Sequence, residues 1–280
     1  MPDAASTSRF YDELAEDYHL IYPDWEASVR RQGAALDALI GRAGAAVLDC
    51  ACGIGTQALG LALRGHRVVG TDLSAGAVAR ARREAGRLGA GLVTAVADMR
   101  QLPLADGRFD AVVCADNGLP HLLTEGDVRA ALAEMRRVLR PGGRLLVSTR
   151  RYDDLLRDRP ASTPPQVHEP ADGTGRTVTF QLWHWHEDGE HYDLEHFQLL
   201  PGQGEQGEQG EQQEWRVRVR RCVYWALGRD RLAGFAAAEG FADIVWLMPE
   251  ETGFFQPLLM ARRPAIKESP FSGAAGLDAV

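Results

Sequence analysis

The strongest local pattern in the chain is the stretch Val47-Leu-Asp-Cys-Ala-Cys-Gly-Ile-Gly-Thr-Gln57. Its apolar residues predict a short buried strand, its Gly-x-Gly pair a tight turn, and the residues from Thr56 onward a helix. Gly53 and Gly55 allow the backbone to turn sharply and to approach a ligand closely. The unpaired N–H groups at the start of the helix can receive a carboxylate or a phosphate. The stretch therefore predicts a strand–turn–helix unit that binds a nucleotide-like ligand.

Strand and helix patterns alternate around this unit as far as residue 150. A capped helix is expected before it, over residues 24–40. After it we expect helices over 56–64, 74–88 and 125–139, and the strands of this region over 46–49, 67–71, 92–97, 109–115 and 145–149. Short apolar strands that alternate with helices are typical of an α/β fold with a parallel sheet.

The pattern changes after residue 150. Three strand-like runs follow one another without helices, and Asp188-Gly189 is a hairpin turn signal between the first two. The runs cover residues 176–186, 190–200 and 214–225. A helix over 229–239 and two strands over 244–248 and 256–261 then follow. We interpret the three runs as an antiparallel sheet inserted after the fifth strand, and the last two strands as an antiparallel pair that completes the main sheet.

Composition limits the classes of protein to consider. The chain has 280 residues, 45% of them hydrophobic, and a formal net charge of −8. This acidic balance disfavours nucleic acids and anionic membranes as partners, because both require clustered Lys and Arg. No apolar run approaches the ~20 residues of a membrane span, and the N-terminal residues do not resemble a secretory signal. The four cysteines are expected to be buried thiols, so a cytoplasmic location is predicted.

Two aspartates at successive strand ends strengthen the prediction of a nucleotide site. Asp72 ends the second strand, where its carboxylate can accept hydrogen bonds from both ribose hydroxyls. Asp98 ends the third strand, where a carboxylate can accept a hydrogen bond from the amino group of adenine. Each could instead be a helix cap or a turn former, but together with the Gly-x-Gly turn they favour a bound nucleoside.

These motifs resemble those of the class I S-adenosylmethionine-dependent methyltransferases. Asp-Cys-Ala-Cys-Gly-Ile-Gly is similar to the glycine motif of that family, and the segments around Asp72, Asp98, 109–114 and 138–147 are similar to its later motifs, in the same order. The resemblance implies a Rossmann-like seven-stranded sheet with a reversed final strand, and S-adenosylmethionine as cofactor with S-adenosylhomocysteine as product. It also implies the cofactor-binding residues, which are Tyr18, Arg31 (or less favoured Arg30), Asp49, Ala51, Gly53, Gly55, Asp72, Leu73, Asp98, Met99, Ala115 and Asn117.

A narrower resemblance is to the glycine and glycine/sarcosine N-methyltransferases and to related actinobacterial small-molecule methyltransferases, including indoline C-methylating ones. It rests on the segments Asp116-Asn117-Gly-Leu-Pro-His121 and Thr149-Arg150-Arg151-Tyr152-Asp153. Gly-Leu-Pro replaces the Ser-x-Ala that is more usual in the first segment, which weakens the transfer of substrate identity. We therefore place methylation of nitrogen or carbon in a specialised metabolite, such as an indole- or indoline-type amine, ahead of glycine or sarcosine methylation.

Three residues are the predicted catalytic groups. His121 follows the fourth strand at the ligand-binding edge of the sheet and is a candidate general base. Tyr22 could direct its hydroxyl at the nucleophile, although aromatic packing would also explain it. Arg150 could bind a substrate carboxylate through two hydrogen bonds, or could form a salt bridge with Asp153 or Asp154.

The inserted sheet is predicted to cover the cofactor cleft with aromatic side chains, which would suit a flat or cationic substrate. The residues expected to line the cleft are Tyr11, Trp183, Trp185, Tyr192 and Trp225. His184, His186 and Glu190 resemble a metal-binding pattern, but the turn at Asp188-Gly189 separates them, so no metal is predicted.

The sequence suggests five segments in order. They are an N-terminal helical lid (1–44), a cofactor-binding core (45–150), a substrate cap (151–227) with a disordered Gly/Glu/Gln loop (202–213), the C-terminal part of the core (228–263) and a flexible tail (264–280). The expected partner is a small-molecule methyl acceptor, and a homodimer stays open. Two other classes also stay open: a non-catalytic cofactor-binding protein, and an NAD-dependent oxidoreductase, which Ala58 disfavours because it replaces the third glycine of Gly-x-Gly-x-x-Gly.

Overall fold

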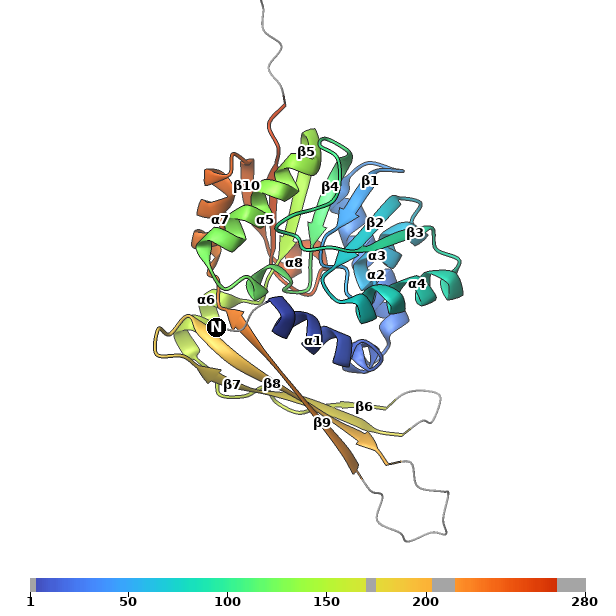
Figure 1. The fold of residues 1–280 in the computed structure, drawn as a ribbon, viewed down its shortest axis with the longest axis vertical. Helices are drawn as coiled ribbons and strands as arrows, with labels where there is room; N and C mark the ends of the chain where they lie inside the picture. The colour runs from blue at the N-terminus through green and yellow to red at the C-terminus, as the bar shows by residue number, and fades with distance from the viewer. Residues whose placement is uncertain (1–3, 170–174, 203–214, 266–280) are drawn as a thin grey trace, which may run out of the picture.

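The chain forms two sheets with a helix between them. The computed structural model describes residues 4–169, 175–202 and 215–265. A seven-stranded mixed sheet with helices on both faces lies beside a four-stranded antiparallel sheet (Figure 1). This confirms the predicted fold class, including the antiparallel cap inserted after the fifth strand. The predicted loop at 202–213 and tail at 264–280 lie almost entirely outside the described residues.

The large sheet has the strand order β10-β11-β5-β4-β1-β2-β3. β11 pairs antiparallel with both β5 and β10, and the other pairings of this sheet are parallel, so the predicted reversed final strand lies between β5 and β10. The strands of this sheet are β1 (Ala46–Asp49), β2 (Arg67–Asp72), β3 (Leu92–Val96), β4 (Phe109–Cys114), β5 (Leu139–Ser148), β10 (Ala242–Leu247) and β11 (Leu258–Arg262). The central strands are apolar and buried because helices cover both faces of a parallel sheet. Their carboxyl ends meet at one edge, where the predicted ligand-binding residues are found.

Capping residues set the boundaries of helices that pack on the large sheet. The side chain of Asp24 accepts a hydrogen bond from the N–H of Ala27 at the start of α2, and Gly41 ends that helix in the left-handed conformation. Ser74 caps α4 in the same way. The helices are α1 (Ala4–Leu14), η1 (Tyr18–Ile21), α2 (Trp25–Ile40), α3 (Thr56–Leu63), α4 (Ala75–Leu88), η2 (Leu119–His121), α5 (Glu125–Val138), α6 (Tyr152–Asp158), α7 (Arg229–Ala238) and α8 (Pro249–Thr252).

The small sheet is antiparallel throughout, in the order β6-β7-β8-β9. Its strands are β6 (Gln166–His168), β7 (Thr177–Trp185), β8 (His191–Pro201) and β9 (Trp215–Trp225). The three long strands match the three predicted runs, and the chain turns at Asp188-Gly189 as expected. The sequence did not predict β6, because it is three residues long in a proline-rich segment.

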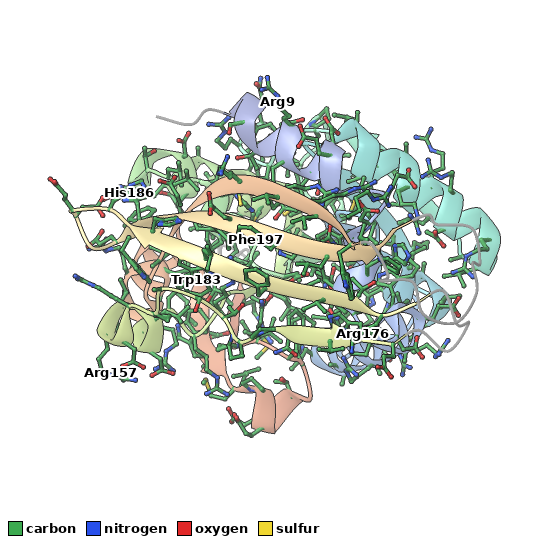
Figure 2. All side chains as sticks on the ribbon, turned by 90° about the horizontal axis from the view of Figure 1, so that it is seen from below. Arg9, Arg157, Arg176, Trp183, His186 and Phe197 are labelled. Atoms are coloured by element: carbon green, nitrogen blue, oxygen red, sulfur yellow. The ribbon has the colours of Figure 1, made fainter. Side chains whose placement is uncertain are left out.

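The face of the small sheet that is turned away from the main sheet, seen in Figure 2, carries apolar side chains beside the ion pair of Glu195 and Arg221. The rings of Phe180 and Phe197 stack there with centroids 4.7 Å apart. Val167, Val217 and Val219 are exposed on this sheet. This outer face remains accessible to solvent.

Helix α1 lies between the two sheets (Figure 1) and packs against both α4 and β9. Phe10 and Leu14 are buried among the inner side chains of the small sheet. Beyond the helix, the carboxylate of Asp17 accepts a hydrogen bond from Arg220 at 2.7 Å. The N-terminal segment is therefore fixed to both sheets and closes the space between them.

Gly33 and Gly60 should be sensitive to substitution because α2 and α3 cross through them. A Cβ on Gly33 would lie 2.5 Å from the carbonyl carbon of Gly60, so an alanine there requires the helices to separate. We expect Gly33→Ala to lower the free energy of unfolding by about 1–3 kcal/mol in urea titrations. Gly86→Ala on α4, where nothing lies within 4 Å, should instead stabilise the protein by up to about 1 kcal/mol. Equal effects of the two substitutions would contradict the close crossing.

Candidate active site

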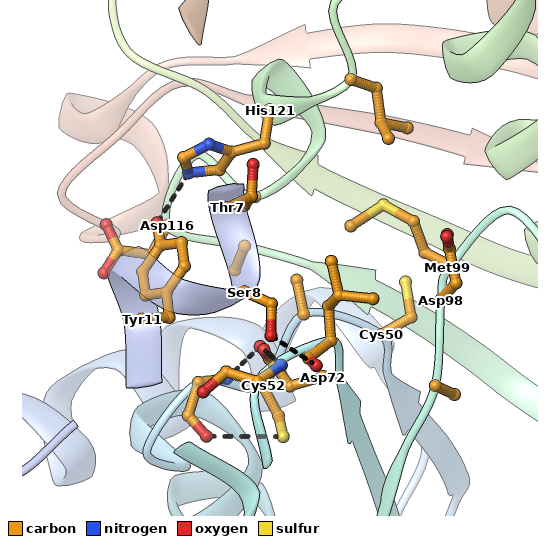
Figure 3. Close-up of a pocket in the computed structure, with 18 of the residues that line it drawn as sticks. Thr7, Ser8, Tyr11, Cys50, Cys52, Asp72, Asp98, Met99, Asp116 and His121 are labelled. Carbon is orange, nitrogen blue, oxygen red and sulfur yellow. Dashed lines mark hydrogen bonds between the residues drawn. The ribbon is translucent and has the colours of Figure 1, made fainter. Parts of the chain in front are cut away.

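A cavity of about 480 Å³ opens at the carboxyl edge of the large sheet (Figure 3). The segments that follow β1, β2, β3 and β4 form its walls, and Thr7, Ser8 and Tyr11 of α1 close one side. This is where ligands bind in open α/β sheets. We call it the cofactor cavity.

The turn after β1 is held to the loop after β2 by one carboxylate. Asp72 Oδ2 accepts a hydrogen bond from the N–H of Gly53 at 2.8 Å, and Oδ1 accepts one from the N–H of Ser74 at 2.9 Å. Burial raises the pKa of Asp72, although these N–H groups act in the opposite direction. Gly53 and Gly55 have φ of 51° and 96°, which explains why the turn requires glycine. Asp72 therefore shapes the cofactor cavity as well as lining it.

The other predicted nucleoside-binding aspartate is fixed by an arginine. Arg100 donates to both carboxylate oxygens of Asp98, at 3.1 Å from Nε and 2.6 Å from Nη2, and also to Asp127. Burial acts to raise the pKa of Asp98, but the bonds from Arg100 outweigh it and hold the pKa below its usual value. Asp98 is thus an ionised hydrogen-bond acceptor at the wall of the cofactor cavity.

A second cavity, of about 220 Å³, lies between the large sheet and the inner face of the small sheet. We call it the inner cavity. Tyr11, Tyr18 and Asp116 line both cavities and so mark the place where they meet. The small sheet contributes Gln181, Leu194, His196 and Tyr224 to the inner cavity.

Asp116 is the carboxylate at this junction. Its Oδ2 accepts hydrogen bonds from the hydroxyls of Tyr18 at 2.8 Å and of Tyr22 at 3.0 Å. Burial raises its pKa, while the bonds from the two tyrosines and the charge of Arg150 lower it. Asp116 and Asn117 have φ of 51° and 66°, a conformation that costs non-glycine residues energy and is found at functional sites. The backbone after β4 is therefore bent to bring this carboxylate to the junction.

His121 is close to the junction but is not a strong base. Its Nε2 lies 2.7 Å from the hydroxyl of Tyr11, and its ring lies 4.1 Å from that of Tyr224. Burial and the positive charge of Arg150 lower its pKa to about 3, so the imidazole is neutral near neutral pH. In the tautomer with its proton on Nδ1, it accepts the hydrogen bond of Tyr11 and leaves the tyrosine oxygen free to accept another.

Arg150 brings a positive charge to the inner cavity. Its guanidinium donates to the hydroxyl of Tyr192 at 2.9 Å and lies between the rings of Trp183 and Tyr224, 5.1 and 5.0 Å from their centroids. Such cation–π contacts stabilise a cation that is held away from bulk water. Asp153 pairs with Arg229 and Asp154 with Arg157, so the alternative of a salt bridge from Arg150 to either aspartate is wrong.

Most of the predicted cofactor-binding residues line the cofactor cavity. They are Tyr18, Ala51, Gly53, Asp72, Leu73, Asp98, Met99 and Ala115. Asn117 lines the inner cavity instead. Asp49 is fully buried, which raises its pKa to about 7, and Gly55 lies at the N-terminus of α3, where no side chain caps the helix. Neither of these two lines a cavity.

The structure does not bring Arg31 to the site. Arg31 is exposed on α2 and donates to Ser28, while Arg30 pairs with Glu26, and neither lines a cavity. The start of α3 faces the cofactor cavity through Thr56 and Gln57. Its N–H groups, rather than Arg31, are in position to receive a carboxylate. Tyr22 likewise uses its hydroxyl on Asp116 rather than pointing it into either cavity.

The predicted aromatic cap also needs correction, except for Tyr11. Trp183, Trp185, Tyr192 and Trp225 line neither cavity among the described residues. Trp183 and Trp185 lie near the 188–189 turn and pack against Tyr192, and Trp225 packs with α7 where β9 leaves the sheet. The cavity opens farther along the strands, so Gln181 and His196, which pair across β7 and β8, reach it instead. The alternation of apolar and polar residues in the sequence predicts which side chains share a face, but not where along the strands the cavity lies.

The histidines of the suspected metal pattern have other partners. His184 lies 3.6 Å from Glu195, and His186 lies 3.2 Å from Asp193. Within residues 4–169, 175–202 and 215–265, no group of three or more His, Cys, Asp or Glu residues could hold a metal ion. All four cysteines are buried and free. In the same residues, no helix is both long and apolar enough to cross a membrane.

The buried His196 should make the protein less stable in mild acid. Burial lowers its pKa to about 4 from the usual 6.5, so the unfolded chain binds a proton that the folded chain does not between these pH values. The contribution of His196 to the free energy of unfolding is complete above pH 6.5. Between pH 6.5 and 4 it falls by up to about 1.4 kcal/mol per pH unit as the pH drops. Urea titrations at pH 7 and 5 should show a smaller loss for His196→Gln than for the wild type. Parallel losses would show that His196 is protonated in the folded protein.

Part of the chain is similar in sequence to known methyltransferases. Residues 47–143 match the family model described as a methyltransferase domain. A glycine/sarcosine N-methyltransferase of Parasynechococcus marenigrum is 39% identical over 157 residues, 54% of this chain and 55% of that protein. A demethylmenaquinone methyltransferase of Beutenbergia cavernae is 38% identical over 148 residues, 52% and 58% of the two chains. The chain therefore spans a little over half the length of these curated relatives.

A solved structure extends the similarity over nearly the whole chain. The CcbJ methyltransferase of Streptomyces caelestis superimposes with a TM-score of 0.71, covering 94% of this chain and all of that one at 21% identity. This superposition shows that the two proteins share one fold. Together, the methyltransferase domain at residues 47–143, the related N-methyltransferases and the shared fold support a class I S-adenosylmethionine-dependent methyltransferase.

The cofactor of this family, S-adenosylmethionine, fits the residues present. Asp72 offers a carboxylate for the ribose hydroxyls, and Asp98 an acceptor for the adenine amino group. The N-cap of α3, Gly55, has no side chain, and Thr56 and Gln57 of the first turn line the cavity, so their N–H groups can receive the carboxylate of the methionine part. A Cβ on Gly118 would lie 2.7 Å from the Cβ of Ala51, which shows how closely the backbone packs beside the cavity.

Proposed function

We propose that the protein transfers a methyl group from S-adenosylmethionine to a nucleophilic nitrogen or carbon of a small molecule. The observation that carries this proposal is the junction of two cavities at Tyr11, Tyr18 and Asp116. One cavity is lined by cofactor motifs and the other by the inserted sheet, so donor and acceptor would meet at the junction. S-adenosylmethionine supplies a methyl group on a sulfonium, which a nucleophile displaces in line.

The residues of the chain would hold and orient the reactants rather than attack them. Asp72, Asp98 and the start of α3 would hold the cofactor in its cavity. The hydroxyl oxygen of Tyr11, whose proton is shared with neutral His121, would accept a hydrogen bond from the acceptor and direct its lone pair. Helix α1 and the small sheet would exclude water from the junction.

The lining of the inner cavity favours an acceptor with a flat apolar ring, of a specialised metabolite type such as an indole- or indoline-type amine. Aromatic rings of Phe10, Tyr11, Tyr224 and Phe255 surround it. Flat ligands gain contact area against such rings at little cost in ordering. The small sheet covers one side of the cavity, which disfavours a macromolecular acceptor.

Glycine or sarcosine methylation is the second candidate, and it is favoured by Arg150. A guanidinium that lines the inner cavity could bind an amino-acid carboxylate. The 39% identity to a glycine/sarcosine N-methyltransferase supports it. Against it, Arg150 already donates to Tyr192 and Gln181, and the aromatic lining exceeds what glycine needs.

The proposal is tested by binding and by methyl transfer. Calorimetry should show that S-adenosylhomocysteine binds and that NAD does not, which separates the proposal from an oxidoreductase. With labelled S-adenosylmethionine, we expect transfer to tryptophan derivatives or indolines above the transfer to glycine and sarcosine. Faster glycine turnover would reverse the order of the two candidates. Cofactor binding without transfer to any acceptor would favour a non-catalytic role.

A cytoplasmic location and a homodimer stay predictions.

We propose that a second copy of the chain packs on the outer face of the small sheet, the face that carries Phe180, Phe197 and Val219. The four strands have 3, 9, 11 and 11 residues, which gives that face roughly 540 Å², about two thirds of the ~800 Å² per partner of a stable interface. Light scattering should report a dimer for the wild type and a monomer for Val219→Asp. A dimer of unchanged strength in the variant would exclude this face.

A further inference from the structure

We propose that Asp116 binds the protonated amine of the methyl acceptor and takes its proton, which makes the acceptor class an organic ammonium. The proposal rests on the proposed methyl transfer and deepens it, because it names the chemistry of the acceptor. Asp116 is one of the three residues that line both cavities. Figure 3 shows its carboxylate beside Tyr11 and His121, at one side of the cofactor cavity.

Asp116 lacks a cationic partner in the part of the chain that is described. None of the ion pairs found in residues 4–169, 175–202 and 215–265 includes it. The nearby cation, Arg150, is engaged with Tyr192 and Gln181 and with two aromatic rings. A carboxylate removed from bulk water is costly unless it is paired. A bound ammonium would supply the missing charge.

The hydrogen bonds of Asp116 leave one side of the carboxylate open. Tyr18 and Tyr22 both donate to Oδ2, so Oδ1 remains for a ligand in the cavity. The backbone is held in place, since the N–H of Asp116 donates to Ser148 Oγ at 2.8 Å, and that hydroxyl donates to Gln256. The strained φ values of Asp116 and its neighbour are thus supported by specific contacts. The carboxylate is rigid and faces the junction.

The aromatic groups beside Asp116 also suit a cation. Tyr11 and Tyr18 stand at the same junction, with ring centroids 6.4 Å apart, and Tyr224 lines the inner cavity. Ring faces attract an ammonium, and this attraction increases where water is excluded. A negative charge is also useful at this place because the methyl donor is itself a cation, which would otherwise repel an ammonium.

An ammonium has no lone pair, so it must lose a proton before it can accept a methyl group. In the proposed step an N–H bond of the ammonium breaks, its electron pair stays on nitrogen, and the proton forms an O–H bond on Asp116. The ion pair becomes a neutral amine and a carboxylic acid, so charge is conserved. Burial raises the pKa of Asp116, which makes the carboxylate a better proton acceptor than one in water.

Three indole probes of similar size test the recognition of the ammonium. Tryptamine carries an ammonium group, indole-3-propionate carries a carboxylate, and L-tryptophan carries both. Calorimetry on the full chain saturated with S-adenosylhomocysteine should show tryptamine binding at least ~10-fold more tightly than indole-3-propionate. Asp116→Asn should abolish this preference by weakening tryptamine alone. Asp193→Asn, on an exposed residue of β8, is the matched control and should bind like the wild type. The proposal would be overturned if indole-3-propionate bound more tightly than tryptamine, or if none of the three probes bound.

The pH profile of methyl transfer tests the proton step. For tryptamine we expect Asp116→Asn to lower kcat/KM at pH 7 by ~100-fold or more. Its rate should rise tenfold per pH unit towards the pKa of the amine, because only the free amine reacts, while the wild-type profile stays flat there. Profiles of equal shape would show that Asp116 does not take the proton.

Different results would overturn the role of Asp116 and the proposed methyl transfer. Labelled methyl transfer to phenols or carbon nucleophiles, but to no amine, would sustain the proposed function and overturn the role of Asp116. No binding of S-adenosylhomocysteine would overturn both. Unfolding in urea reports whether Asp116→Asn is folded, and Asp116→Glu, which keeps the charge, should recover part of the tryptamine affinity.

Discussion

Asp72→Asn should lower the affinity for S-adenosylhomocysteine by ~100-fold or more. The carboxylate faces the cofactor cavity and would accept bonds from two ribose hydroxyls, each contributing about 1.5–3 kcal/mol when the acceptor is charged. It also accepts hydrogen bonds from the N–H groups of Gly53 and Ser74, one at each oxygen. An asparagine amide can accept hydrogen bonds only at its oxygen, because its nitrogen is a donor. The variant therefore loses ligand contacts and loosens the turn that shapes the cavity. Isothermal calorimetry measures the effect.

The control for Asp72 is Asp243→Asn, a matched substitution at an exposed residue of β10. Asp243 has φ of 53°, which asparagine tolerates, and it lies far from both cavities in the sheet order. We expect its affinity for S-adenosylhomocysteine to equal that of the wild type. An affinity of Asp72→Asn within threefold of the wild type would mean that the ribose is held elsewhere.

The main sheet and the cofactor cavity could be predicted because their signals are local. A strand that runs into Gly53-Ile-Gly55 and a helix can adopt few other arrangements, and the carboxyl ends of parallel strands meet at one edge. Asp72 and Asp98 follow their strands directly, so their positions in sequence fix their positions in space. The predictions for these residues depended on backbone geometry rather than on side-chain packing.

The contacts of the cap could not be predicted because they depend on how two separate sheets are placed. Alternation along a strand tells which residues share a face, but not which part of that face lies over the cavity. Trp183 and Trp185 were therefore predicted to line the cofactor cleft, whereas the strands of the small sheet reach only the inner cavity, through residues that include Gln181 and His196. Arg31 fails for a similar reason, since the direction of a helical side chain depends on the rotation of α2 against α3.

Asp116 had a signal in the sequence that was not used for the site. An Asp-Asn pair directly after a strand is suited to left-handed backbone, because short polar side chains tolerate positive φ. Two successive residues in that conformation redirect the chain sharply. The two tyrosines that bind Asp116 come from residues 18 and 22, about 100 positions earlier. No local pattern predicts such a long-range contact, and only the folded structure brings these groups together.

His121→Gln and Tyr11→Phe should each lower kcat by ~100-fold, because they remove one oriented hydrogen-bonded pair. Burial raises the pKa of the Tyr11 hydroxyl and lowers that of His121 to about 3, so neither group changes charge near neutral pH. Their expected role is to direct the lone pair of the acceptor, and the affinity for S-adenosylhomocysteine should change less than threefold. Single-turnover rates with labelled S-adenosylmethionine measure the loss.

The double variant decides whether the two residues act as a unit. If the neutral imidazole only holds the Tyr11 hydroxyl in place, the combined loss should be no larger than either single loss. His186→Gln on the exposed hairpin is the control and should keep the wild-type rate. If His121 were a general base of ordinary pKa, the wild-type rate would fall as the pH drops below about 6.5. This falling limb of the pH–rate profile would be missing in His121→Gln. Because His121 is buried as a neutral group, we expect no such limb, and finding one would restore His121 as the base.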